Sequence, residues 1–209
     1  MRAAPTILQT GSSSQVAPPR RTPNHEVSRG SSFRKLVSMP SPSPHVDRPW
    51  MPVGYGVPET TKGLIEWRVV EHRLIEAVSY WIASTRPDGR PHVVPRWGVW
   101  VDGGLFYDGS PDTVHARNLA GNARCVLHIE DGARAVIVEG VSGASGPPSP
   151  DLGRRLSDAF GAKYATHGYH PPPDAWNGPD SGGLMRFVPE KAMAWFDFPA
   201  DVTRFRFDS

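Results

Sequence analysis

The residues best suited to chemistry lie in one short segment, from Ser110 to Asn118. Ser110 and the proline after it are typical of a helix start, where unpaired N–H groups can face an anion. Thr113, His115 and Arg117 add a hydroxyl donor and two side chains that can carry positive charge. The segment therefore predicts a site for an anionic group. The structural alternative is that Thr113 caps a helix, Arg117 is a surface charge and Asn118 forms a turn.

Motifs of known catalytic types are absent from the sequence, which has no Gly-x-Ser-x-Gly, no His-Glu-x-x-His, no Walker loop and no Rossmann glycine fingerprint. No catalytic side chain is therefore assigned. A domain without a positioned nucleophile or a metal cage is better suited to holding a cofactor that brings its own chemistry. His167 and His170 beside Asp174 are interpreted as a surface feature, so no metal site is expected. The single cysteine, Cys125, is expected to be a buried thiol.

The spacing of apolar residues predicts which elements must position these side chains. Steps of three and four residues predict helices over residues 59–78, 110–121 and 151–164. Short runs of β-formers between turn signals predict strands over residues 80–85, 92–101, 105–107, 124–129, 134–141, 184–188, 192–198 and 203–207. The fold class is therefore mainly β: an antiparallel barrel, closed or nearly closed, with a few short peripheral helices.

The chain divides into two parts by composition. Residues 1–58 are basic and rich in proline and serine without apolar periodicity, which predicts a disordered tail, and residues 59–209 form the folded domain. The tail could touch an anionic partner; alternatively it is merely solvated, or translation starts at Met39 or Met51. Because no apolar run suits a signal peptide or a membrane helix, a cytoplasmic protein without nucleic-acid or membrane partners is expected.

Several stretches together resemble the pyridoxamine 5'-phosphate oxidase-like split barrels, a superfamily that includes the flavin- and deazaflavin (F420)-dependent oxidoreductases. They are residues 89–100, 105–107 and 113–119, and the resemblance extends over residues 64–141. Trp195 and residues 203–207 look like the last strands of the family. The resemblance implies an antiparallel FMN-binding split β-barrel.

The resemblance also implies where a flavin-type cofactor, F420 or FMN, would lie. One strand would run along the flavin ring, and it contains Val94, Pro95, Arg96 and Trp97. The segment that would hold the phosphate contains Ser110, Thr113, His115, Arg117 and Asn118. Relatives usually carry Lys or Arg where His115 stands, and a neutral histidine gives up most of that charge. Arg96 and Arg117 could compensate.

Two tryptophans lie on the strand assigned to the ring. Trp97 and Trp100 could line a pocket for a planar group, or they could form a protein–protein contact. The resemblance implies a homodimer with the cofactor at the subunit interface, where Trp195 and Arg204 would face the partner's cofactor.

The leading functional hypothesis is an F420- or FMN-dependent oxidoreductase that transfers hydride or electrons to a small organic substrate. F420 is slightly favoured, because the basic phosphate motif of the true oxidase is incomplete here. One alternative is a non-catalytic split barrel that binds flavin, F420 or haem. The other is pyridoxamine 5'-phosphate oxidase, which is disfavoured because Arg204 and Arg206 flank Phe205 where an Arg-x-His motif would be expected.

Overall fold

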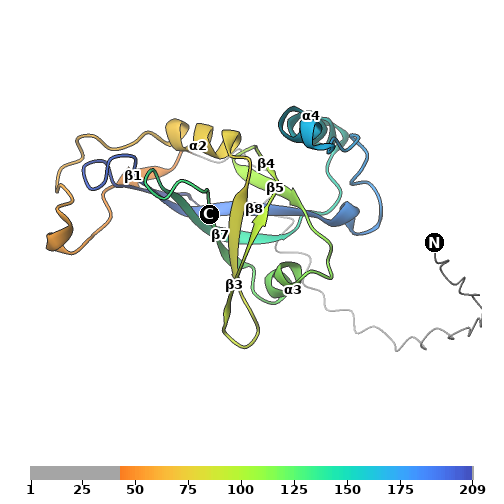
Figure 1. Cartoon of the computed structure of the whole chain (residues 1–209), viewed down its shortest axis with the longest axis horizontal. Helices are drawn as coiled ribbons and strands as arrows, with labels where there is room; N and C mark the ends of the chain where they lie inside the picture. Colours follow the sequence, from red (N-terminus) through yellow and green to blue (C-terminus); the bar gives the residue numbers. More distant parts are fainter. Residues whose placement is uncertain (1–42, 209) are drawn as a thin grey trace, which may run out of the picture. The chain divides into compact units, whose positions relative to one another are not determined.

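A computed structural model describes residues 43–208 of the chain. Its centre is a nine-stranded antiparallel sheet with the order β1-β9-β8-β7-β6-β2-β3, to which β5 joins by pairing with β8, and β4 by pairing with β5 (Figure 1). The strands are β1 (His45–Asp47), β2 (Tyr80–Thr85), β3 (Pro91–Arg96), β4 (Val99–Val101), β5 (Gly104–Asp108), β6 (Arg124–His128), β7 (Val136–Ala144), β8 (Leu184–Ala194) and β9 (Thr203–Arg206).

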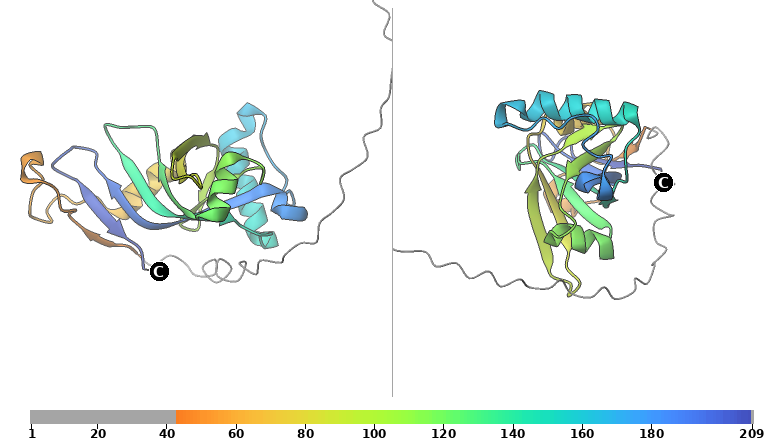
Figure 2. Two further views of the ribbon diagram at one scale, coloured as in Figure 1. Left: turned by 90° about the horizontal axis from the view of Figure 1, so that it is seen from below. Right: turned by 90° about the vertical axis from the view of Figure 1, so that its right-hand side faces the viewer.

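Short helices accompany the sheet. They are α2 (Trp67–Glu76), α3 (Val114–Gly121) and α4 (Pro150–Tyr164), with the 3-10 turns η1 (Val53–Tyr55), η2 (Ala165–His167) and η3 (Pro179–Gly183). Helices α3 and α4 lie on opposite sides of β4 and β5 (Figures 1 and 2). Between residues 43 and 208 no helix has both the length and the apolar character needed to cross a bilayer.

The fold class expected from the sequence is confirmed, although several boundaries differ. The helix expected over residues 59–78 begins only at Trp67. The strand expected over residues 92–101 is broken between β3 and β4, because Gly98 packs against β5: a Cβ there would lie 2.8 Å from the Phe106 carbonyl oxygen. The strand expected at 184–188 and the start of the one expected at 192–198 form a single strand, β8, which passes a bulge opposite Glu139 and Gly140 and ends at Ala194.

The barrel is not closed. Among the described strands, β3 pairs only with β2 and β4 only with β5, so the bend at Gly98 leaves a seam. Helix α4 spans this seam with two side chains. The Tyr164 hydroxyl accepts a hydrogen bond from the Gly98 N–H at 2.9 Å and lies 2.8 Å from the Gly98 carbonyl oxygen. The Lys163 ammonium donates to the carbonyls of Ala77 and Gly98, and burial lowers its pKa to about 8.

Two apolar clusters form the core. The larger one, between α2, α3 and the sheet, includes Leu74, Ile82, Leu127, Phe187 and Phe205. The smaller one, between α4 and strands β4 and β5, includes Val99, Phe106, Phe160, Tyr164 and Trp176. The second cluster fixes the segment after β7 against the strands that bear the candidate site.

The folded part starts earlier than the boundary expected at residue 59. His45–Asp47 form β1, which pairs with β9 in the register Val46 to Phe205. Asp47 accepts hydrogen bonds from the Arg204 guanidinium at 2.8 Å, and this ion pair holds the pKa of its carboxyl below the usual range. So short a strand has too few residues for a period-2 pattern, and its pairing partner is distant in sequence. The remainder of the expected tail, residues 1–42, lies outside the described residues.

Candidate functional site

The candidate site forms where α3 lies beside β3. Asn118 of α3 is buried, and its amide donates to the Ser84 hydroxyl of β2 at 3.1 Å, which ties the helix to the sheet. At the helix start, the Thr113 hydroxyl donates to the Ser110 carbonyl at 2.7 Å. These contacts fix the first turn of α3 and thereby place His115 on the side of β3.

Within residues 43–208, three nitrogen atoms at this junction are buried without a hydrogen-bond partner: Nδ1 of His92, Nε of Arg96 and Nε2 of His115. Buried polar groups in proteins are nearly always hydrogen-bonded, so a group of unpaired nitrogens requires an explanation. Each of these nitrogens can donate to an anion when its side chain carries the proton. The junction of β3 and α3 is therefore a candidate anion site.

The electrostatics of His115 fit that interpretation. The side chain is 2% exposed, and burial lowers its pKa to about 4, with further lowering from the Arg96 and His92 side chains. The imidazole is therefore neutral at neutral pH. An anion bound among the three side chains would remove the mutual repulsion and raise the pKa of His115.

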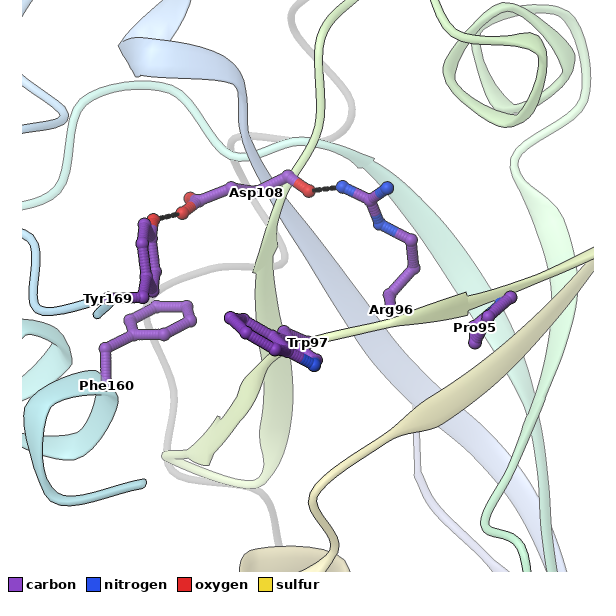
Figure 3. Close-up of a pocket in the computed structure, with 6 residues that line it drawn as sticks. All are labelled: Pro95, Arg96, Trp97, Asp108, Phe160 and Tyr169. Atoms are coloured by element: carbon purple, nitrogen blue, oxygen red, sulfur yellow. Dashed lines mark hydrogen bonds between the residues drawn. The ribbon is translucent and has the colours of Figure 1, made fainter. Parts of the chain in front are cut away.

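A pocket of about 320 Å³ opens next to this junction, and we call it the β3 pocket (Figure 3). It is lined by Pro95, Arg96, Trp97, Asp108, Phe160 and Tyr169. Trp97 is 42% exposed, and its ring stacks on Tyr164 with a centroid separation of 4.8 Å. The pocket therefore combines flat aromatic walls with two groups that can be charged, Arg96 and Asp108.

Asp108, at the end of β5, is the acidic group of the β3 pocket. One carboxyl oxygen accepts the Trp176 indole N–H at 2.9 Å, and the other is hydrogen-bonded to the Tyr169 hydroxyl. The Arg96 guanidinium donates to the backbone carbonyl of Asp108, on the side away from Tyr169 (Figure 3). Burial raises the pKa of Asp108, although the Trp176 hydrogen bond and the Arg96 charge act in the opposite direction.

A second cavity, of about 410 Å³, lies along α3. Its walls are mostly small residues: Gly109, Pro111, Ala116, Arg117, Ala120, Gly143, Ala144, Gly146, Ser181, Gly183, Leu184 and Met185. The Arg117 guanidinium donates to the Asp112 carbonyl at the start of α3. Arg117 therefore contributes its charge to this cavity and not to the β3 pocket.

The structure separates the nine predicted site residues into groups. Pro95, Arg96 and Trp97 line the β3 pocket, and His115 lies close enough to Arg96 for that charge to lower its pKa. Val94 is half-buried and pairs with Ile82 of β2. Asn118 and Thr113 bond within the protein, as does the Ser110 hydroxyl, which accepts the N–H of Asp112 at 3.2 Å. The side chains of Ser110, Thr113 and Asn118 thus fix the first turn.

Sequence reasoning missed four residues of the site: His92, Asp108, Phe160 and Tyr169. His92 alternates with Val94 and Arg96 along β3, and this period-2 spacing was the signal that could have found it. The other three come from two distant segments, the end of β5 and the chain from α4 onward. No local pattern links those segments.

Metal-binding clusters are not present in the part of the chain that the structure describes: no three His, Cys, Asp or Glu side chains come together there. His167 instead lies edge-on to the Trp97 ring at 5.5 Å between centroids. Cys125 is buried, and burial raises the pKa of its thiol to about 12.

Comparison of the sequence with known proteins finds no matching family model and no matching curated protein. Solved structures do match. A conserved hypothetical protein from Mycobacterium tuberculosis is 18% identical with a TM-score of 0.50, and the match covers 65% of this chain and 88% of that one. An F420 reductase is 19% identical with a TM-score of 0.40, covering 66% and 93%. The heme storage protein HutZ from Vibrio cholerae is 22% identical with a TM-score of 0.46, covering 61% and 91%.

These structural neighbours are split-barrel proteins. The chain has the same fold: a mostly antiparallel sheet that does not close, with a few short helices. At these identities the likeness concerns the fold, and the chemistry must be argued from the site.

Proposed function

We propose that the protein binds a flavin-type cofactor, F420 or FMN, and is an oxidoreductase that transfers hydride or electrons to a small organic substrate. The observation that carries the proposal is the group of unpaired buried nitrogens of His92, Arg96 and His115, next to a pocket with aromatic walls. Flavin-type cofactors combine a phosphate, which the unpaired nitrogens could hold, with a planar ring that could lie along β3 beside the pocket.

The donor set suits a phosphate group. Arg96 supplies a permanent positive charge, and His92 and His115 supply ring nitrogens that are already desolvated. The first turn of α3 adds backbone N–H groups and the positive end of the helix dipole. Hydrogen bonds between such groups and a phosphate are among the stronger ones in proteins. A phosphate held there would satisfy the nitrogens that lack partners.

The ring would lie along β3, where Val94, Pro95 and Trp97 present backbone groups and an aromatic face. When bound, the cofactor supplies hydride or electron transfer at its ring. The residues of this chain orient the two reactants and exclude water. Trp97, stacked on Tyr164, is fixed in position and can therefore set the distance at which a flat substrate lies.

We also propose a cytoplasmic homodimer. Strand β3 is a sheet edge, and Val93 is 51% exposed on it, so the edge is suited to pairing with a second chain. Trp195 is half-buried and its ring contacts Phe198 at 5.8 Å between centroids, and the Arg204 guanidinium is engaged with Asp47. Sedimentation at several concentrations tests this proposal, and a mass of one chain throughout would contradict it.

Binding titrations test the cofactor assignment. The purified protein is titrated separately with FMN and with F420, following the absorption and fluorescence of each. Arg96→Ala should weaken binding about tenfold or more, since it removes a charged donor. Arg154→Ala is the matched control, because Arg154 is exposed and pairs with Asp151 on α4. Saturable binding of neither compound would refute the proposal, as would equal effects of the two substitutions.

A second candidate is a non-catalytic module that binds haem. It is favoured by one observation: His115 is neutral, buried and unpaired at Nε2, which is the state of a histidine that ligates iron. Titration with haem would then give a histidine-ligated spectrum that His115→Gln abolishes. Turnover of a reduced flavin-type cofactor with a panel of electron acceptors separates this module from the oxidoreductase.

A further inference from the structure

The β3 pocket contains a pair of groups that the proposed function does not use. Asp108 and Tyr169 are hydrogen-bonded to each other at the wall of the pocket, and the Tyr169 ring lies beside the Trp97 ring, 6.4 Å away between centroids (Figure 3). Tyr169 is held in place by Phe160, whose ring meets it edge-on at 5.6 Å. The pair comes from two distant segments, yet both members line the same space.

The hydrogen-bond pattern around Asp108 leaves a defined place for a proton. Its Oδ1 accepts the Trp176 N–H and its Oδ2 accepts the Tyr169 O–H, so both oxygens act as acceptors when the carboxyl is ionised. If Oδ2 carries a proton, it donates to Tyr169, and the tyrosine O–H then points away from Asp108 into the pocket. An ionised Asp108 would instead hold the tyrosine proton itself.

We propose that the β3 pocket binds a planar carbonyl compound, that Tyr169 donates a proton to its oxygen, and that Asp108 replaces this proton. Tyr169 is then a catalytic residue and Asp108 a positioning residue that acts through it. This inference rests on the proposed function, because reduction of the carbonyl carbon takes a hydride for which the reduced flavin-type cofactor is the donor.

The step balances. The carbonyl carbon gains a hydride and its two electrons, so the substrate is reduced and its oxygen becomes negatively charged. The O–H bond of Tyr169 breaks and the proton joins that oxygen. The phenolate of Tyr169 takes the proton from Oδ2 of Asp108, and the Asp108 carboxylate recovers a proton from solvent.

The surroundings of Asp108 favour this role. The groups that face it are the Arg96 guanidinium from β3 and the Tyr169 and Trp176 side chains from the segment after α4. Burial raises its pKa, which extends the pH range in which the carboxyl keeps its proton. Arg96 and Trp176 limit the rise, so the proton stays exchangeable.

A phenolate probe tests the pair without any cofactor. 4-Nitrophenolate is planar and carries its charge on an oxygen, as the reduced substrate would. Binding is measured from its absorption over a pH range above the pKa of the free phenol. If Asp108 must be protonated for Tyr169 to donate, binding takes up one proton, and affinity falls about tenfold per pH unit above the pKa of Asp108.

Asp108→Asn is the decisive variant, because asparagine has the shape of a protonated aspartate and permanently donates from one side. It should bind the phenolate at least as tightly as the wild-type protein, and the pH dependence should disappear. Tyr169→Phe keeps the contact with Phe160 but should weaken phenolate binding about tenfold or more at the pH where the wild-type protein binds most tightly. Asp158→Asn, an exposed site on α4, should leave both properties unchanged.

Three results would overturn the inference: no phenolate binding, the same pH dependence in Asp108→Asn as in the wild-type protein, or unchanged affinity in Tyr169→Phe. Titrations of the same variants with FMN and F420 separate this failure from failure of the proposed function. Normal cofactor binding with a negative phenolate result would reject the proton donor alone, whereas loss of all cofactor binding in the wild-type protein would reject the oxidoreductase.

Discussion

The burial of His115 predicts a specific loss of stability in acid. A histidine with a pKa of about 4 when folded and about 6.5 when unfolded binds more protons in the unfolded state between those two values. The free energy of unfolding therefore falls as the pH drops from about 6.5 to about 4, by up to about 3 kcal/mol at 1.36 kcal/mol per pKa unit. At neutral pH the burial of His115 makes almost no pH-dependent contribution to the free energy of unfolding.

The measurement is urea unfolding followed by tryptophan fluorescence, at about pH 7 and about pH 4.5, where the His115 term alone should amount to roughly 2.5 kcal/mol. His115→Gln removes the term, so the variant should lose that much less stability on acidification than the wild-type protein. His72→Gln, an exposed histidine of α2, is the control and should behave as wild type. Asp108 has the opposite sign, because its raised pKa favours the folded state as the pH falls, but it contributes equally to all three proteins.

Adding sulfate to the same unfolding measurement tests the proposed anion site at His115. Sulfate keeps its charge over this pH range, and its binding beside His115 should raise the pKa of the imidazole. The acid-induced loss in the wild-type protein should then shrink when sulfate is added, while His115→Gln should show no such effect. Equal acid losses in the wild-type protein and His115→Gln would refute the reasoning about burial, and an absent sulfate effect would refute the anion site.

Other predictions concern the framework of the site and are checked by the same unfolding assay. Asn118→Ala should cost about 1–3 kcal/mol, because it leaves the buried hydroxyl of Ser84 without its partner. Gly140→Ala should destabilise by about 2 kcal/mol or more, since a Cβ there would overlap a carbonyl of β8, whereas Gly121→Ala meets open space and should be neutral or stabilising. Tyr164→Phe should cost about 1–3 kcal/mol by leaving an N–H of the bend unpaired, and it should leave the protein folded. Equal stability of the two glycine variants would contradict the packing argument.

The fold could be predicted because most of its elements have local signals. Runs of β-formers between turn signals indicated β2 and β6, and residues 151–164 had the helical spacing seen in α4. What could not be predicted depends on distant partners. The chain stays extended through Glu190 in β8 because β7 and β9 hold it on either side of the bulge, a constraint that no window of the sequence contains.

The candidate site was predicted in part for the same reason. Arg96 and His115 lie on regular elements and Trp97 directly follows β3, and the family resemblance of these segments could select all three. Tyr169 lies in an irregular, proline-rich segment, and its hydrogen bond to Asp108 joins residues sixty-one positions apart. The role of Asp108 depends on burial by that segment, which the sequence around β5 does not encode.

The open seam at Gly98 has a consequence for how this protein could diversify. Residues 160 and 169 of the β3 pocket belong to the segment that bridges the seam, whereas residues 95–97 and 108 belong to the barrel and its connections. One half of the pocket can therefore change by substitution, insertion or shortening of that segment without altering a single strand pairing. The barrel can therefore stay constant in evolution while the segment that bridges the seam varies and adapts the pocket to new ligands.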